Sequence, residues 1–111
     1  RRLGMVSVPS AMTSNEIWAA HQEGAGMVKI FPASVMPPAT LKQMLGVGPF
    51  KQLLFLPSGG IGPDNVAEWW SAGAAAVGMG SNLVGSDVGC ASDSEAFGAA
   101  RAAWETKGRE A

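Results

Sequence analysis

A lysine in an otherwise apolar run is the first residue of this sequence that could do chemistry. Lys29 stands in GAGMVKIFPAS, between Val28 and Ile30, in a segment with the pattern of a buried strand. A charge left in an apolar interior is costly unless it is paired or neutral. The amine must therefore reach solvent, find a partner or lose its proton, and a neutral amine can form a Schiff base with a ketone. Both a snorkelling side chain and a nucleophile fit this spacing.

Two glycine-rich stretches come next among the candidate functional residues. They are PSGG at positions 57–60 and GMGS at positions 78–81, and each follows a predicted strand and precedes a helical start. Glycine lets backbone N–H groups approach an anion closely, and a helix N-terminus adds a favourable dipole. Either loop alone is typical of a tight turn, whereas the adjacent pair favours a phosphate site.

The elements that would position these residues alternate along the chain. We predict short strands at Met5–Val8, Met27–Phe31, Gln52–Leu56 and Ala74–Val77, separated by helices at about 13–24, 40–45 and 62–73. A capping box, Thr13 to Glu16, begins the first helix, and Pro63 suits the first position of the third. A second capping box at 92–95 begins a final helix. This alternation predicts βαβ units and a parallel sheet.

The candidate residues all fall at the carboxyl ends of the predicted strands. Ligands bind at these ends in β/α barrels and in open α/β sheets. The ends here are Pro9-Ser10, Lys29 to Pro32, and the two glycine loops. Two such loops on consecutive final strands match the phosphate site that follows the last two strands of a barrel.

Composition limits the classes of protein that this chain could be. Its 111 residues are 47% hydrophobic and 15% charged, which fits one small globular domain. A net charge of -1 argues against nucleic acid as a partner. No apolar run approaches the roughly 20 residues that span a bilayer. We expect a cytoplasmic or organelle-interior protein. Its targeting is undetermined, because the chain begins at Arg1 without a methionine.

The remaining conspicuous residues suggest structural roles. His21 has no second histidine or acidic cluster beside it, so we predict no metal site. The single cysteine, Cys90, excludes an internal disulfide and suits a reducing compartment. Trp18, Trp69 and Trp70 occupy helical positions and are predicted to pack helices onto the sheet or onto a neighbouring subunit.

At these residues the sequence resembles the 2-keto-3-deoxy-6-phosphogluconate aldolase family, including its phosphogalactonate branch. The matching stretches are VKIFPA at 28–33, LPSGGI at 56–61 and VGMGSNL at 77–83, and the resemblance covers about Val6 to Leu83. It implies a (β/α)8 TIM-barrel fold and a metal-independent class I enzyme without a cofactor. We expect this chain to be the C-terminal half of the barrel, about four β/α units at 4–84, a connection at 85–92 and a C-terminal helix at 93–111.

The resemblance also assigns roles to individual residues. Lys29 corresponds to the Schiff-base lysine. Substrate contacts are carried over to Pro9, Phe31 and Ser58, and phosphate binding to Gly59, Gly60, Gly80 and Ser81. Ser58 stands where threonine is usual in the gluconate branch, and Pro9-Ser10 stands where the family usually has Pro-Gly. Its catalytic glutamate and carboxylate-binding arginine come from early strands that this chain does not contain.

The implied reaction is reversible cleavage of a 2-keto-3-deoxy-6-phosphosugar acid of the phosphogluconate type to pyruvate and glyceraldehyde 3-phosphate. Two enzyme alternatives remain, with phosphogalactonate or 4-hydroxy-2-oxoglutarate as substrate. An alternative of another class is a non-catalytic phosphate-binding remnant or assembly module. The resemblance implies a homo-oligomer, a trimer in the family, for the full-length protein. No membrane or nucleic-acid partner is expected.

Overall fold

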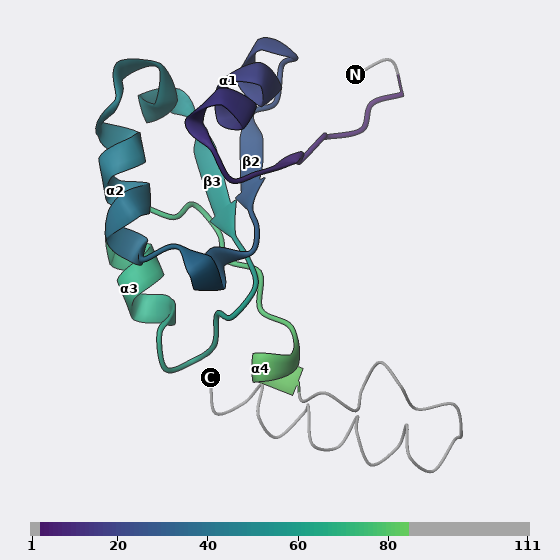
Figure 1. Cartoon of the computed structure of the whole chain (residues 1–111). Helices are drawn as coiled ribbons and strands as arrows, with labels where there is room; N and C mark the ends of the chain where they lie inside the picture. Colours follow the sequence, from purple (N-terminus) through teal and green to yellow (C-terminus); the bar gives the residue numbers. More distant parts are fainter. Residues whose placement is uncertain (1–2, 85–111) are drawn as a thin grey trace.

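The computed structural model describes residues 3–84, which form a small parallel sheet with helices packed on it (Figure 1). The strands β1 (Ser10–Ala11), β2 (Met27–Ile30) and β3 (Leu54–Pro57) lie in the order β1-β2-β3. Both pairs are parallel, and Lys29 of β2 is in register with Ser10 on one side and Leu56 on the other. The predicted βαβ organisation is therefore confirmed for these strands.

The segments that connect and follow the strands are helical. They are α1 (Ser14–Gln22), η1 (Ala33–Val35), α2 (Pro38–Gly46), η2 (Gly48–Gln52), α3 (Val66–Ser71) and α4 (Ser81–Val84), where η denotes a 3-10 helix. The capping box predicted at the start of α1 is present: Thr13 Oγ1 accepts from the Glu16 N–H at 3.3 Å, and the Glu16 carboxylate accepts from the Thr13 N–H at 2.8 Å. None of the helices within residues 3–84 is long and apolar enough to cross a membrane.

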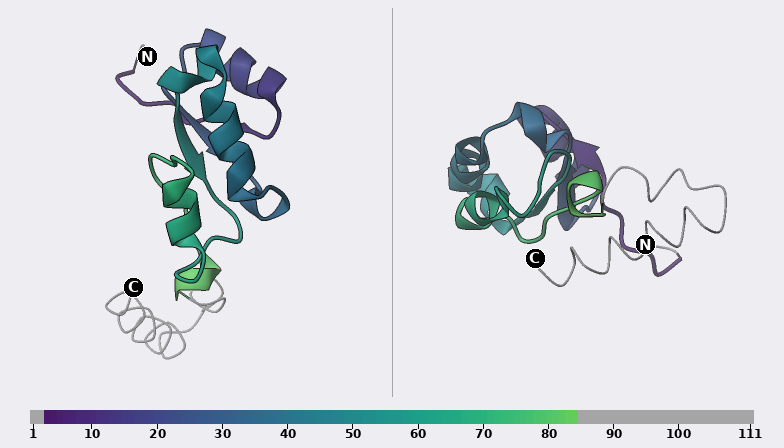
Figure 2. Two further views of the ribbon diagram at one scale, coloured as in Figure 1. Left: turned by 90° about the vertical axis from the view of Figure 1, so that its left-hand side faces the viewer. Right: turned by 90° about the horizontal axis from the view of Figure 1, so that it is seen from below.

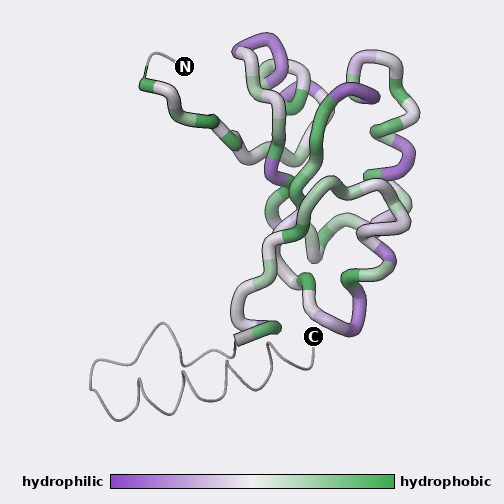
Figure 3. Tube along the Cα trace, turned by 180° about the vertical axis from the view of Figure 1, so that it is seen from behind, coloured by the Kyte–Doolittle hydropathy of each residue, from purple (hydrophilic) through white to green (hydrophobic). Residues whose placement is uncertain are grey.

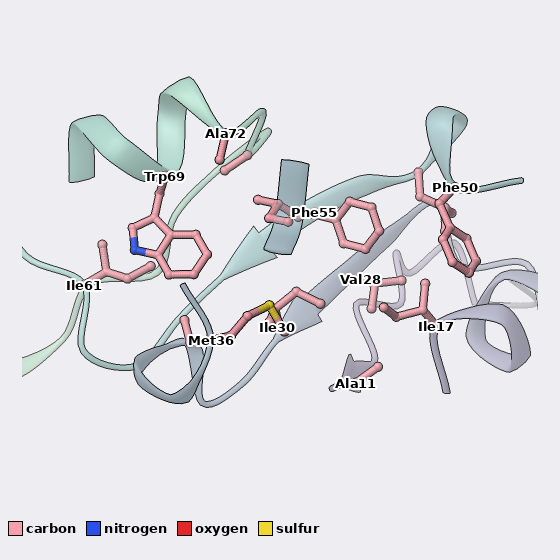
Figure 4. Packing of buried hydrophobic residues seen from close by; sticks show 14 of the residues in the cluster. Ala11, Ile17, Val28, Ile30, Met36, Phe50, Phe55, Ile61, Trp69 and Ala72 are labelled. Carbon is pink, nitrogen blue, oxygen red and sulfur yellow. The ribbon is translucent and has the colours of Figure 1, made fainter. Parts of the chain in front are cut away.

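One hydrophobic cluster holds the helices against the sheet (Figure 4). Val28 and Ile30 of β2 and Phe55 of β3 have no exposed surface, and Ile17 of α1 and Leu41 of α2 meet them with none exposed either. Trp69 brings α3 into the same cluster with 4% exposed. Helices α2 and α3 also lie side by side and share a groove (Figure 2). The helices therefore cover one face of the sheet.

The other face of the sheet remains open. Along β2 and β3 buried residues alternate with more exposed ones, because successive side chains of a strand point to opposite faces. Lys29 and its register neighbour Leu56 are half-buried on this second face, and Leu54 is 49% exposed. The lysine that looked buried in the sequence thus points away from the helix-covered core.

The strand predicted at Met5–Val8 is wrong. These residues have no regular secondary structure, and Val6 is 85% exposed. Figure 3 shows them as a hydrophobic stretch leading away from the sheet. Pairing with β2 starts only at Pro9, whose carbonyl accepts from the Lys29 N–H at 2.8 Å, so the strand that forms is Ser10–Ala11. A hydrophobic segment does not become a strand where the neighbouring strand offers it no backbone partner, and β2 offers one only from Pro9 onward.

The strand predicted at Ala74–Val77 is also not formed as such. This segment follows β3 through three backbone bonds. The Ala75 and Ala76 N–H groups donate to Phe55 O at 3.0 and 3.5 Å, and the Gly78 N–H donates to Pro57 O at 2.8 Å. The regular pairing is an isolated parallel bridge between Ser58 and Gly78. The predicted connection at 85–92 and C-terminal helix at 93–111 lie outside the described residues.

Candidate active site

The structure brings Lys29 together with Phe31 and the first glycine loop at the carboxyl end of β2. Lys29 Nζ lies 4.8 Å from the centroid of the Phe31 ring, a distance at which a cation is attracted to the ring face. The ring itself is 48% exposed. Within residues 3–84 no carboxylate forms an ion pair with this amine. Phe31 therefore holds the amine beside an accessible aromatic wall, and its peptide bond to Pro32 is cis.

Gly59 and Gly60 form a loop that suits an anion. Both have left-handed backbone, with φ of +92° and +80°. A side chain on Gly59 would start 3.1 Å from Phe31 Cε2, so its backbone approaches the ring that covers the lysine. The N–H groups of Gly59 and Gly60 have no acceptor among residues 3–84. Two successive free N–H groups in such a turn make an anion-binding concavity.

Ser58 joins this loop to the segment that follows α3. Its N–H donates to Ile30 O at 2.9 Å, and its carbonyl accepts from the Ala33 N–H at 2.8 Å. A Cβ atom added to Gly78 would lie 2.6 Å from Ser58 Oγ. The Ser58 hydroxyl thus packs directly against the bare backbone of Gly78, which leaves no space for a side chain there.

The second glycine loop meets the first at Ser58 and Gly78, which form a parallel bridge. Gly80 and Ser81 are exposed at the start of α4. Just beyond the loops, a Cβ atom added to Gly62 would lie 3.1 Å from the Cβ of Asn82 in α4. The structure therefore places all four predicted phosphate residues on neighbouring loops. Gly59 and Gly60 are the pair that it brings against Phe31.

Asn65 is a site-organising residue that the sequence interpretation missed. Its side-chain oxygen accepts from the Gly62 N–H at 3.0 Å, and its side-chain nitrogen donates to Gly60 O at 3.0 Å. The predicted helix start at Pro63 is wrong, because residues 63–65 form a turn and α3 begins at Val66. Asparagine side chains commonly hydrogen-bond to nearby backbone groups in turns, and this signal could have revealed the role of Asn65.

Glu16 is engaged in a structural role on α1. Its carboxylate accepts from the Met12 N–H at 2.9 Å, the Thr13 N–H at 2.8 Å and the Thr13 hydroxyl at 3.0 Å. The Met12 bond first, followed by those from Thr13, lowers the pKa of the Glu16 carboxyl below its ordinary value of 4.5. Because this oxygen caps the helix, Glu16 is unsuited to serve as a base for Lys29.

Within the described residues no group of three or more histidine, cysteine, aspartate or glutamate side chains could hold a metal ion. His21, the residue considered for ligation, instead lies against Trp18, with ring centroids 5.5 Å apart. Trp69 packs onto the sheet as predicted, whereas Trp18 and Trp70 are 40% and 62% exposed.

Comparison with curated proteins finds relatives among aldolases. The chain is 39% identical over 80 residues to 2-dehydro-3-deoxy-6-phosphogalactonate aldolase of Escherichia coli, an alignment that covers 72% of this chain and 38% of the relative. It is 36% identical over 63 residues to 2-dehydro-3-deoxy-phosphogluconate aldolase of Pseudomonas aeruginosa, covering 56% and 28% respectively. The aligned part of the chain thus spans well under half of these relatives.

Solved structures of similar fold agree with the curated relatives. One is described as a native KDPGal structure, with a TM-score of 0.69, 34% identity, and coverage of 96% of this chain and 50% of the other. Another is a cube-shaped, highly porous protein cage designed by fusing symmetric oligomeric domains, with a TM-score of 0.69, 32% identity, and coverage of 96% and 38%. The α/β fold with its parallel sheet is thus of the TIM-barrel-like type. The family described as "Aldolase: KDPG and KHG aldolase" matches residues 2–99, so the chain belongs to the KDPG and KHG aldolase family.

Proposed function

We propose that this chain supplies the Schiff-base lysine and the phosphate-binding loops of a class I aldolase. The observation that carries the proposal is the position of Lys29. Its amine stands on the open face of the sheet, beside a ring that touches a loop with two unbonded N–H groups. A nucleophilic amine and an anion-binding loop at one end of a parallel sheet suit a substrate that carries both a ketone and a phosphate.

In the proposed reaction the Lys29 amine adds to the keto carbon of a 2-keto-3-deoxy-6-phosphosugar acid, and water leaves to form a protonated imine. The C4 hydroxyl then loses its proton, the C3–C4 bond breaks, and its electron pair moves into the imine. Glyceraldehyde 3-phosphate departs, and the enamine of pyruvate remains on Lys29. Protonation at C3 and hydrolysis of the imine release pyruvate and restore the amine.

The other site residues would hold the substrate in place. Phe31 would wall the imine, and Pro9 and Ser58 would line the substrate from the neighbouring strand ends. The phosphate would accept hydrogen bonds from Gly59 and Gly60 and from the loop of Gly80 and Ser81. Binding energy from a phosphate remote from the bond that breaks can be used to position the reacting end.

Proton transfer is the part of the chemistry that residues 3–84 do not offer close to Lys29. Glu16 caps a helix, Asp64 lies exposed in the turn before α3, and Glu68 lies at a cavity between α2 and α3. A positioned acid or base contributes typically about 10²–10⁴-fold to such a step. We therefore propose that this group comes from outside the described residues, and that residues 4–84 correspond to about four β/α units of the relatives' barrel.

A phosphogalactonate substrate is the second candidate. The relative named as a phosphogalactonate aldolase is 39% identical over 80 residues, against 36% over 63 residues for the phosphogluconate enzyme. Both substrates would use the same lysine, and they differ only in the configuration of one carbon. For the full-length protein we propose a homo-oligomer.

Borohydride trapping tests the role of Lys29. Incubation of the full chain with pyruvate and borohydride should leave a stable adduct on the peptide that contains Lys29. Lys42 and Lys51, both exposed on helical segments away from the strand ends, serve as internal controls. Lys29→Arg should abolish the adduct, because a guanidinium keeps the charge but stays protonated.

Two outcomes of the trapping experiment would refute the assignment. One is an adduct of equal yield on Lys42 or Lys51, which would show that any surface amine reacts. The other is no pyruvate-dependent mass shift at all, which would favour a non-catalytic phosphate-binding module.

A further inference from the structure

Ser10 of β1 lies beside Lys29 on the open face of the sheet. The two residues are partners in the parallel register, and neighbouring strands of a sheet are about 4.7–4.9 Å apart. Ala11, the next residue of β1, is 5% exposed and belongs to the hydrophobic cluster on the helix-covered face (Figure 4). Because successive side chains of a strand point to opposite faces, the exposed Ser10 side chain lies on the same face as Lys29.

The surroundings of the Lys29 side chain differ between its two sides. On the β3 side its register partner is Leu56, which is apolar and half-buried. On the β1 side its partner is Ser10, whose hydroxyl forms no hydrogen bond with any group among residues 3–84. A serine hydroxyl carries one O–H donor. Of the two register partners of Lys29, Ser10 is therefore the one that can donate a hydrogen bond to a ligand on the amine.

The strand order fixes the direction in which a substrate on Lys29 would lie. The first glycine loop follows β3, and the second is joined to it by the bridge between Ser58 and Gly78, on the far edge of β3. Lys29 is on the middle strand, and Ser10 is on β1, the strand on the opposite side. In a 2-keto acid the C1 carboxylate and the phosphate-bearing chain extend from opposite sides of C2. With the phosphate on the glycine loops and C2 on the amine, the carboxylate is directed toward β1.

We propose that Ser10 contacts the substrate, and that its hydroxyl donates a hydrogen bond to the C1 carboxylate of the keto acid held on Lys29. This inference rests on the proposed aldolase function. A hydrogen bond to an ionised acceptor is shorter and stronger than one between neutral groups. Ser10 therefore contributes to specificity: it favours a 2-keto acid over a ketone that has a methyl group in place of the carboxylate.

Borohydride trapping with two ligands tests this contact in the full chain. Pyruvate carries the carboxylate, whereas acetone has a methyl group in its place. Each is titrated under the same brief exposure to borohydride, and the adduct on the Lys29 peptide is measured by mass spectrometry. Ser10→Ala should raise the pyruvate concentration at half-maximal adduct about two- to tenfold, the effect of one net hydrogen bond, and should leave that of acetone unchanged. Ser10→Thr, which keeps a hydroxyl, should stay close to wild type.

Ser7→Ala is the matched control, because Ser7 is exposed in the segment before β1 and outside the register with β2. It should change the result with neither ligand. The inference is overturned if Ser10→Ala is trapped by pyruvate as readily as wild type. It is also overturned if pyruvate and acetone weaken equally, because the change would then lie in the amine and not in a carboxylate contact. Absence of any Lys29 adduct in the wild type would refute the aldolase function itself, and the role of Ser10 with it.

Discussion

Replacing Gly60 by alanine tests the close packing between the first glycine loop and η1. The new methyl group would lie 2.8 Å from Ser34 Cβ and 3.4 Å from Ser34 Cα, and it would have to accept a φ of +80°. A non-glycine residue in left-handed backbone costs about 1–2 kcal/mol. Overpacking against a neighbouring side chain adds about 1–3 kcal/mol. Gly60→Ala should therefore lower the free energy of unfolding by about 2–5 kcal/mol.

The two contributions can be separated by removing the obstacle. In a Ser34→Gly background the methyl group no longer meets Ser34 Cβ, so Gly60→Ala should retain only the backbone penalty of about 1–2 kcal/mol. Gly46→Ala is the matched control, because Gly46 ends α2 with nothing within 4 Å of an added Cβ. That change should be neutral or stabilising by about 0.5–1 kcal/mol, since alanine favours a helix over glycine.

Urea unfolding of the full chain, followed by far-ultraviolet circular dichroism, measures all of these variants. A loss below about 1 kcal/mol in Gly60→Ala would refute the predicted backbone penalty. An equal loss with and without Ser34→Gly would show that the contact with Ser34 contributes nothing.

Two further predictions concern the start of α1. Thr13→Ala removes the side chain that accepts from the Glu16 N–H and should lower the free energy of unfolding by about 1 kcal/mol in urea titrations, and no change would exclude a stabilising cap. Glu16→Gln should destabilise the chain at neutral pH, because the folded-state pKa of Glu16 lies below its ordinary value of 4.5. The stabilisation by the ionised carboxylate is therefore present above pH 4.5 and is lost as the pH falls through the folded-state pKa. Unfolding at a series of pH values should show the gap between wild type and variant narrowing in acid, and a widening gap would contradict the assignment.

Local sequence signals predicted the parts of the fold that local interactions determine. The capping box at Thr13 and Glu16 depends on atoms a few residues apart, and it forms as expected. The strand around Lys29 was also recognisable, because Val28 and Ile30 alternate with it along β2. Which face those residues bury could not be read from their pattern alone, since it depends on where the helices pack.

The two strand predictions that failed depended on partners far along the chain. Met5–Val8 has a strand-like composition, but the register with β2 begins only at Ser10. The cavity beside Trp69 could not be predicted either, because its wall combines segments around Ser34, Gly60 and α3. Such a space exists only after those segments have folded against each other.

The contact between Ser58 and Gly78 restricts the order in which the two positions can change during evolution. A first carbon added at Gly78 would meet the Ser58 hydroxyl at 2.6 Å, although Gly78 is not among the described glycines with positive φ. Sterics alone, and not backbone conformation, therefore exclude a side chain there. If Ser58 is replaced by glycine first, position 78 gains the space for an alanine. If Gly78 is replaced by alanine first, the Ser58 hydroxyl has to move out of its place. Two residues on separate segments thus form one evolutionary unit, and any attempt to diversify this end of the sheet must vary them together.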